Sequence, residues 1–398
     1  MNSSDQIADS GSDPARPMTV LQLVPTLETG GVERGAIEIV RALTAAGHRA
    51  LVVSAGGRME PQLRRAGGEL FQMNIGSKNP VTIWRNARAL QKIIRDENVD
   101  IVHARSRAPA WAGWNAVRAT GTRFITTYHG VYNEGGIPFK RWYNSVMARG
   151  NPVIAVSEHV ASVIQARHRI PASRIVTIPR GADIQSFAEE VVTSERTISL
   201  AQSWGAIEDS RPIVMLPGRL TRWKGAEDLI AATALIKQRN PDFDMQIVLV
   251  GDDSGSGYGA TLEQAVRTAG LTDVVRMVGH CADMEAAYKL SAVVVSASRE
   301  PEAFGRVAVE AQAMGRPIIA TAHGGSLETV EDGVTGWLYP PGDVNALADS
   351  VEAAMSLDDS ARAHMGMAAR ARIRSRFTVE QMQMATLAVY ADDPAQSD

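Results

Sequence analysis

The sequence alternates short apolar segments with amphipathic helical segments, and it does so twice along the chain. The first series has β-rich segments at 19–24, 50–54, 101–103, 124–127, 153–156 and 175–178. A second series begins at 213–216 and continues through 246–250, 274–278, 293–296 and 317–320. Strands that alternate with helices form parallel sheets with helices on both faces. The chain is therefore predicted to be an α/β protein with two doubly wound, Rossmann-like domains facing a cleft.

The length of 398 residues also favours two domains over one ordinary core. Residues 183–211 lack strong periodicity and hold no clear strand, so the domain junction is placed there. We expect an N-terminal domain over 18–190 and a C-terminal domain over 191–375. Residues 1–17 are polar without an apolar period, and they are predicted to be a disordered tail.

The cysteine count and the distribution of apolar residues argue against a disulfide-bonded, membrane-spanning or secreted protein. Cys281 is the only cysteine, so no disulfide within the chain and no cysteine-rich metal site is expected. No apolar run reaches the ~18 residues of a membrane span. The first 17 residues have neither the basic start nor the apolar centre of a secretory signal. These features predict a cytoplasmic protein.

Charge is unevenly distributed around the net value of −3. Residues 18–190 contain 22 basic and 13 acidic side chains, a net +9, whereas residues 191–398 carry a net −10. A basic half suggests an anionic partner: a nucleic acid, an anionic membrane surface or a phosphorylated lipid acceptor. Ordinary surface charge is the alternative. No recognised nucleic-acid reader motif is present, so no nucleic-acid partner is predicted.

One loop carries two carboxylates beside a helix start. Glu302, Phe304 and Gly305 follow an apolar strand, and a helix is predicted to begin near Arg306. Free N–H groups at a helix start favour an anion, and glycine allows close approach of a ligand. Glu310 lies inside this helix, and carboxylates accept hydrogen bonds from the vicinal hydroxyls of sugars and riboses. Taken alone, the two glutamates are more often ordinary surface residues.

A second loop carries two cations. The segment LPGRLTRWKG follows a strand and precedes a helix, with Arg219 and Lys224 on the same connection. Two cations with a glycine-containing backbone suit a diphosphate, and they can stabilise charge on a leaving phosphate. Solvated basic residues in a turn are the competing interpretation.

Three further segments carry candidate residues. Gly30 and Gly31 permit close backbone approach at the first predicted helix start. His129 follows a strand and precedes a glycine, which suits a cleft, although a structural histidine fits equally. No other histidine stands near it at ligand spacing, so no metal site is predicted.

The segment GSGYGA at 255–260 fits a dinucleotide fingerprint, but it begins four residues beyond Gly251 and no acidic residue ends the next strand. NAD binding at this segment is therefore disfavoured.

Together these motifs resemble the retaining glycosyltransferases of family 4 over about residues 18–375. The resemblance rests on the two glutamates separated by seven residues in EPEAFGRVAVEA, on GRLTRWKG, on GGVERG and on the HG after an early strand. It implies the two-domain GT-B fold, with a helix over 376–398 that crosses back to the first domain. Arg180 departs from the pattern, because the family often has Asn there.

The resemblance also implies roles for the candidate residues. Glu302 would contact the donor sugar's hydroxyls and Glu310 the ribose hydroxyls, while Arg219 and Lys224 would hold the diphosphate. Gly31, after Gly30, would pack against the phosphates, and His129 would lie near the transferred sugar. The backbone of three consecutive residues would bind the sugar: Phe304, Gly305 and Arg306.

The expected activity is metal-independent transfer of a hexose-type sugar from a nucleotide-diphosphate sugar to a glycan or lipid-linked acceptor, with no further cofactor. Cell-envelope polysaccharide or lipopolysaccharide synthesis is the expected setting. No carboxylate nucleophile is identified, which favours front-face substitution over double displacement. A sugar-nucleotide epimerase of the same fold and an NAD-binding oxidoreductase are the alternatives.

The acceptor side is predicted from basic and aromatic residues in the first domain. The segment IPFKRWYNSVMARG at 137–150 combines cations with aromatic rings, which suits peripheral contact with an anionic membrane. A helix that packs its aromatic rings inward is the alternative. Five arginines are expected to add charge: Arg58, Arg64, Arg65, Arg105 and Arg107.

Overall fold

The computed structural model describes residues 16–28, 30–132, 138–206 and 209–392. Packing divides the described residues into two compact units, one within 1–126 with 149–151 and one within 127–148 with 152–398. Of the tail expected over 1–17, residues 1–15 lie outside the described part. The domain boundaries expected at 190 and 375 stay predictions.

The first sheet has seven strands in the order β3-β2-β1-β4-β5-β6-β7. The pairs β1–β2, β1–β4, β2–β3, β4–β5 and β6–β7 are parallel. The strand bounds are β1 Thr19–Leu23, β2 Arg49–Ser54, β3 Glu69–Gln72, β4 Ile101–Ala104, β5 Arg123–Tyr128, β6 Val153–Ala155 and β7 Ile175–Thr177. The predicted parallel sheet is confirmed, and β3 is an edge strand that the sequence patterns did not reveal.

Helices separate these strands, as the alternating pattern requires. Their bounds are α1 Gly31–Ala45, α2 Glu60–Arg65, α3 Pro80–Asp96, α4 Arg107–Thr120, α5 Pro138–Asn144 and α6 Glu158–His168, with 3₁₀ turns at Ser145–Arg149 and Ala172–Arg174. Ser157 caps α6, because its side chain accepts a hydrogen bond from the N–H of Val160 at 3.0 Å. The N-cap of α3 is Asn79, whose side chain accepts from the N–H groups of both Val81 and Thr82.

The second sheet has six strands in the order β10-β9-β8-β11-β12-β13, and all its pairs are parallel. The strand bounds are β8 Ile213–Pro217, β9 Gln246–Val250, β10 Val275–Gly279, β11 Val293–Ser296, β12 Ile318–Thr321 and β13 Gly336–Tyr339. The helices are α7 Ser194–Ser203, α8 Ala226–Arg239, α9 Tyr258–Thr268, α10 Met284–Leu290, α11 Arg306–Ala313, α12 Ser326–Thr329, α13 Val344–Met355, α14 Asp359–Arg376 and α15 Val379–Ala391, with a 3₁₀ turn at Arg222–Lys224.

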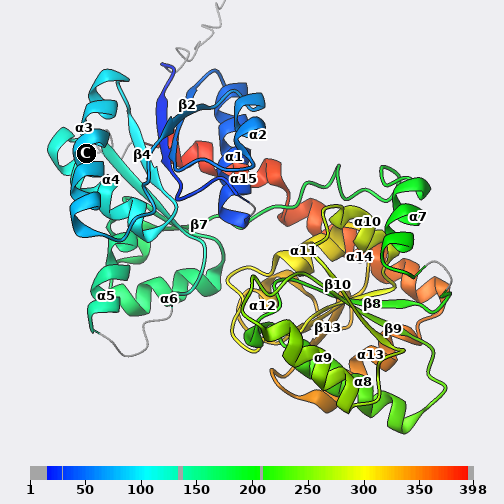
Figure 1. The fold of residues 1–398 in the computed structure, drawn as a ribbon. Coiled ribbons are helices and arrows are strands. Elements are labelled where there is room, and N and C mark those ends of the chain that lie inside the picture. Colours follow the sequence, from blue (N-terminus) through cyan, green and yellow to red (C-terminus); the bar gives the residue numbers. More distant parts are fainter. Residues whose placement is uncertain (1–15, 29, 133–137, 207–208, 393–398) are drawn as a thin grey trace, which may run out of the picture. The chain divides into compact units, whose positions relative to one another are not determined.

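The second sheet is covered on both faces. Figure 1 shows α8, α9 and α13 on one side of it and α10, α11 and α14 on the other. All residues of β8, β9 and β11 are consequently buried, and these strands are continuous apolar runs apart from Gln246 and Ser296. The helix expected at the C-terminus is α15, where Thr378 and Gln381 form a capping box.

The strand order fixes where ligands can bind. From β8 the chain adds β9 and β10 on one side, and it then returns to add β11, β12 and β13 on the other. The direction reverses between β8 and β11, and ligands of such sheets bind beyond the carboxyl ends of the strands at this switch point. The loops after β8 and β11 are those that carry Lys224 and Glu302. In the first sheet the reversal falls between β1 and β4, and Gly30 lies in the loop after β1.

Candidate active site

The loop after β8 is fastened to the loop after β11. Gly225 has a left-handed backbone (φ 72°), and a Cβ built on it would lie 1.9 Å from the carbonyl oxygen of Ala297. The N–H of Arg299 donates to the carbonyl of Trp223 at 2.7 Å. Only glycine fits such a contact, so the two loops predicted to hold the donor are held together by backbone atoms.

Lys224 and Glu302 are in direct contact across these loops. The ammonium of Lys224 lies 2.5 Å from Oε1 of Glu302, and both side chains are mostly buried, at 17% and 14% exposed. Lys224 also lies over the ring of Trp223, 4.3 Å from its centroid. The hydroxyl of Ser298 donates to the same Oε1 at 2.6 Å. A cation and a hydroxyl therefore fix this carboxylate at the switch point.

Arg219 stands at the start of the same loop with its side chain exposed. Within the described part of the chain, no hydrogen bond or ion pair engages its guanidinium. The side chain of Lys224 passes close to Gly218, with its Cε 3.7 Å from the place a Cβ would occupy there. Lys224 and Arg219 thus place two cations on one short stretch of loop. Because the guanidinium of Arg219 is exposed, it is available to bind an anion.

Glu310 lies on α11 and has two partners. Its Oε1 accepts from Arg306 at 2.7 Å, and its Oε2 accepts from the hydroxyl of Tyr288 at 2.9 Å. Tyr288 is fully buried, and its ring packs edge-on against Phe187 at 5.7 Å. The surface position considered for Glu310 is wrong, because its side chain is only 13% exposed.

The helix α11 begins at Arg306 as predicted, and Gly305 is its N-cap residue. Gly305 has a left-handed backbone (φ 88°) and, as a glycine, brings no side chain to the start of the helix. Phe304 is 4% exposed, and its ring packs against Phe377 at 5.7 Å between centroids. The side chain of Phe304 is thus part of the core, so only its backbone can serve a ligand. The first turn of α11 remains suited to an anion or a sugar oxygen.

His129 follows the end of β5. Its Nδ1 lies 3.3 Å from Nη1 of Arg180, which is 8% exposed. A guanidinium only donates hydrogen bonds, so Nδ1 accepts and the ring proton lies on Nε2. Arg180, the residue that departs from the family pattern, therefore orients His129.

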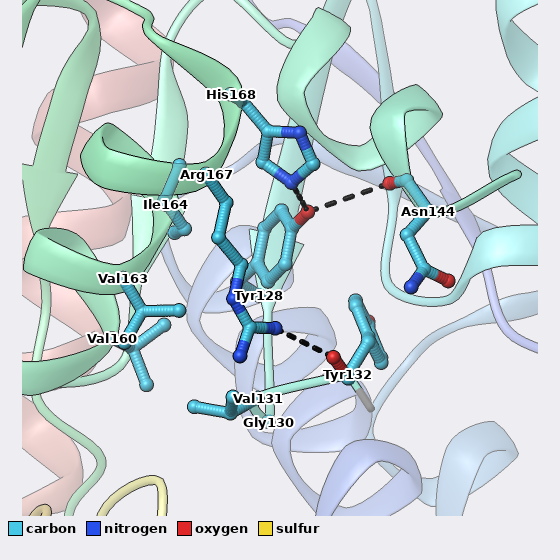
Figure 2. A pocket seen from close by; sticks show the side chains of 10 residues that line it. All are labelled: Tyr128, Gly130, Val131, Tyr132, Asn144, Val160, Val163, Ile164, Arg167 and His168. Atoms are coloured by element: carbon cyan, nitrogen blue, oxygen red, sulfur yellow. Dashed lines mark hydrogen bonds between the residues drawn. The ribbon is translucent and has the colours of Figure 1, made fainter. Parts of the chain in front are cut away.

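A small cavity lies next to the His129 loop, lined by residues of β5, α5 and α6 (Figure 2). The hydroxyl of Tyr128 is 2.7 Å from Nε2 of His168, and Arg167 donates to the carbonyl of Tyr132 at 2.6 Å. The volume of this cavity, about 10 Å³, admits at most one water molecule, so the cavity cannot hold a sugar. The two hydrogen bonds around it fix the loop in place.

Gly30 and Gly31 stand at the start of α1, in the other unit. Gly30 has an extended backbone, and a Cβ there would lie 2.2 Å from Oε2 of Glu33. The helix begins at Gly31, directly after its N-cap Gly30, and it ends at Ala45. Thr29 lies outside the described residues.

The GSGYGA segment does not form a dinucleotide site. The carboxylate of Asp253 accepts from the N–H groups of Gly255 and Gly259, both at 3.0 Å, and so occupies the start of α9. These N–H groups hold the pKa of Asp253 below its usual value. A pyrophosphate would have to displace this carboxylate.

Across the described residues, no three side chains of the His, Cys, Asp or Glu type gather as they would around a metal ion. Of the helices in the described ranges, none combines the length and apolarity that crossing a bilayer requires.

Two family models match the chain, Glycosyltransferase Family 4 over residues 29–186 and Glycosyl transferases group 1 over residues 202–372. The crystal structure of a glycosyltransferase from Rickettsia africae is 35% identical, with a TM-score of 0.85, covering 94% of this chain and 98% of that one. The chain therefore belongs to the GT-B glycosyltransferases of family 4 and group 1, and it is an enzyme.

More distant likenesses extend the comparison. The D-inositol 3-phosphate glycosyltransferase of Pseudarthrobacter chlorophenolicus is 31% identical over 224 residues, 56% of this chain and 51% of that protein. The match thus spans about half the length of this relative. The structure of Anabaena HepE in complex with UDP and glucose is 24% identical with a TM-score of 0.81, covering 94% of this chain and all of that one, which supports the fold.

Proposed function

We propose that the enzyme transfers a hexose-type sugar from a nucleoside-diphosphate sugar to a glycan or lipid-linked acceptor, with retention and without a metal ion. The observation that carries the proposal is the contact of Lys224 with Glu302 beside the exposed Arg219, at the switch point of the second sheet. HepE, whose structure contains UDP and glucose, shares this fold.

The roles follow from the chemistry of these side chains. Arg219 and Lys224 neutralise the diphosphate, which suits cations on one loop next to a glycine backbone. Glu302 accepts hydrogen bonds from the sugar's hydroxyls, and Glu310 from those of the ribose. His129, with its proton on Nε2, donates to the sugar. The first turn of α11 supplies backbone N–H groups.

The proposed reaction is a front-face substitution. The bond between the anomeric carbon and the diphosphate oxygen breaks first, and the electron pair stays on that oxygen. The acceptor hydroxyl attacks the same face and gives its proton to the departing phosphate, so the nucleoside diphosphate leaves protonated. Arg219 and Lys224 stabilise the charge that develops on the phosphate.

Turnover with defined donors tests this proposal. Arg219→Ala should lower kcat at least ~100-fold, because it removes a cation that acts on developing charge. Arg239→Ala is the matched control, since Arg239 lies at the far end of α8 and pairs with Asp349 and Glu352 there. Equal rates for Arg219→Ala and wild type would disprove the role. Retention is read by NMR from the anomeric configuration of the product.

We further propose that the acceptor is lipid-linked or phosphorylated and that the enzyme reaches it at the cytoplasmic face of a membrane, as in cell-envelope or lipopolysaccharide synthesis. Residues 138–142 of α5 are all exposed, with Phe139 at 68% and Trp142 at 52%, and their rings lie 5.6 Å apart. Lys140 and Arg141 stand between them. Apolar rings with adjacent cations suit an anionic lipid surface.

The remainder of the expected membrane segment differs. Ile137 lies outside the described residues, and Val146, Met147 and Ala148 are buried, so this contact is confined to α5. Arg105 was expected to add surface charge, which is wrong: it is 5% exposed and donates to Gln22 at 2.7 Å.

Liposome flotation at low salt tests the membrane contact. Wild type should float with vesicles that contain anionic lipid, and Phe139→Ser with Trp142→Ser should abolish flotation. Because both side chains are exposed, this double variant should keep its fold and its turnover on a water-soluble acceptor. Wild type that stays at the bottom of the gradient would disprove the contact.

A further inference from the structure

The segment after β12, residues 323–325, is hydrogen-bonded to both ends of the loop 298–302. Nε2 of His323 lies 2.8 Å from the carbonyl oxygen of Ser298, and the N–H of Gly325 donates to the carbonyl of Glu302 at 2.8 Å. Between them Gly324 has a left-handed backbone (φ 59°), and a Cβ there would lie 2.5 Å from the carbonyl oxygen of Glu302. The loop from 298 to 302 is therefore held from a neighbouring strand end.

Ser298 connects this held loop to the carboxylate of Glu302. It is fully buried, and its hydroxyl donates to Oε1 of Glu302 at 2.6 Å. Its carbonyl can only accept, so Nε2 of His323 carries the proton of the 2.8 Å contact. His323 thus fixes the backbone of Ser298, and the side chain of Ser298 fixes the carboxylate of Glu302.

The two oxygens of Glu302 are used differently. Oε1 accepts from Lys224 and from Ser298. In the described ranges, no hydrogen bond to Oε2 is present. An anchored oxygen beside an open one is the arrangement expected of a carboxylate that presents a single acceptor in a set direction.

We propose that His323 and Ser298 are positioning residues, which hold Glu302 so that Oε2 meets a hydroxyl of the donor sugar. This inference rests on the proposed function, and it adds that sugar recognition is separable from nucleotide binding. A carboxylate released from Ser298 turns toward Lys224 and loses the productive direction, while the diphosphate contacts of Arg219 and the ribose contacts of Glu310 remain.

The test compares Ser298→Ala, His323→Leu and His323→Gln with wild type. Ser298→Ala and His323→Leu should lower kcat with UDP-glucose about 10- to 100-fold, the loss expected of a displacement near 1 Å. The Kd for UDP, measured by calorimetry, should stay within about twofold of wild type. His323→Gln keeps an N–H near the position of Nε2 and should recover most of the turnover.

Ser291→Ala is the matched control, because Ser291 is buried in the same sheet domain and its hydroxyl donates to Ala287 at 2.7 Å away from Glu302. It should turn over like wild type. The inference is overturned if UDP affinity falls in step with turnover, or if His323→Gln is as impaired as His323→Leu.

A crystal structure of unliganded Ser298→Ala gives an answer independent of activity. The carboxylate of Glu302 should rotate away from its wild-type position, and an unchanged position would overturn the inference. If wild type transfers no sugar from UDP-glucose or another nucleotide sugar, the proposed function fails, whereas the position of Glu302 still decides the positioning role.

Discussion

Glu302 and Glu310 belong to one helix and the loop before it, yet they are held in opposite ways. Glu302 has one oxygen anchored by Lys224 and Ser298, and no described residue donates to the other. Glu310 has a partner on each oxygen, Arg306 and Tyr288. The first carboxylate is ready to receive a ligand, whereas the second must release a partner before it can accept both hydroxyls of a ribose.

Burial indicates which partner of Glu310 leaves. Tyr288 is fully buried among core residues, while the side chain of Arg306 is 27% exposed and bonds Glu310 one turn along the same helix. The Arg306 side chain can turn toward solvent, whereas the hydroxyl of Tyr288 is fixed within the core. Nucleotide binding should therefore displace Arg306 and keep Tyr288.

The largest effect should come from Glu302→Gln. The substitution keeps the shape of the side chain but removes the charge, and it leaves the ammonium of Lys224 mostly buried without its carboxylate. We expect kcat to fall at least ~100-fold, the scale of losing one electrostatic contact in an active site. Steady-state kinetics with a nucleotide sugar checks this, and a loss below tenfold would contradict a reactive role for Glu302.

Tyr288→Phe should have a smaller effect, confined to the nucleotide. It removes one of the two hydrogen bonds that orient Glu310 in both the free and the bound enzyme, so only part of that bond's ~1.5 kcal/mol should appear in binding, and the Kd for the nucleoside diphosphate should rise about threefold. kcat at saturating donor should change little, because Glu302 is untouched. Calorimetry measures the affinity, and a fall in kcat with constant Kd would refute the division between the two glutamates.

Arg306→Gln should have the smallest effect and the opposite sign. If Arg306 competes with the ribose, its removal should tighten nucleoside diphosphate binding about twofold, the scale of one ion pair at i,i+4 spacing on a helix. Lys237→Gln offers a comparison on α8, where the ammonium of Lys237 donates to the backbone carbonyls of Pro241 and Phe243. Weaker binding by Arg306→Gln would show that this side chain holds the nucleotide instead of competing with it.

Buried strands were the most predictable part of the fold. The expected spans 246–250 and 293–296 coincide with β9 and β11, because both strands are apolar runs bounded by turns. β3 was missed, since its four residues have exposed ends and a mixed pattern. The helix α4 was missed too, because small residues and tryptophans obscure its period and Pro109 stands in its first turn.

The candidate site was predicted residue by residue but not contact by contact. Glycines, cations and carboxylates after strand ends were visible in the sequence, since the strand order brings such loops together. Lys224 and Glu302 are 78 positions apart, so no spacing rule could pair them. Tyr288 gave no signal, whereas His323 follows a strand and precedes a glycine just as His129 does, and that signal was overlooked.

Gly225 has a consequence for how this enzyme can change over time. Any side chain at this position would collide with the Ala297 carbonyl and push the two donor loops apart. A change of sugar preference should therefore leave this contact between Gly225 and Ala297, the joint between the loops, in place and alter the residues around it. Diversity in sugar choice should consequently gather in side chains that face the ligand, while the joint itself is inherited unaltered.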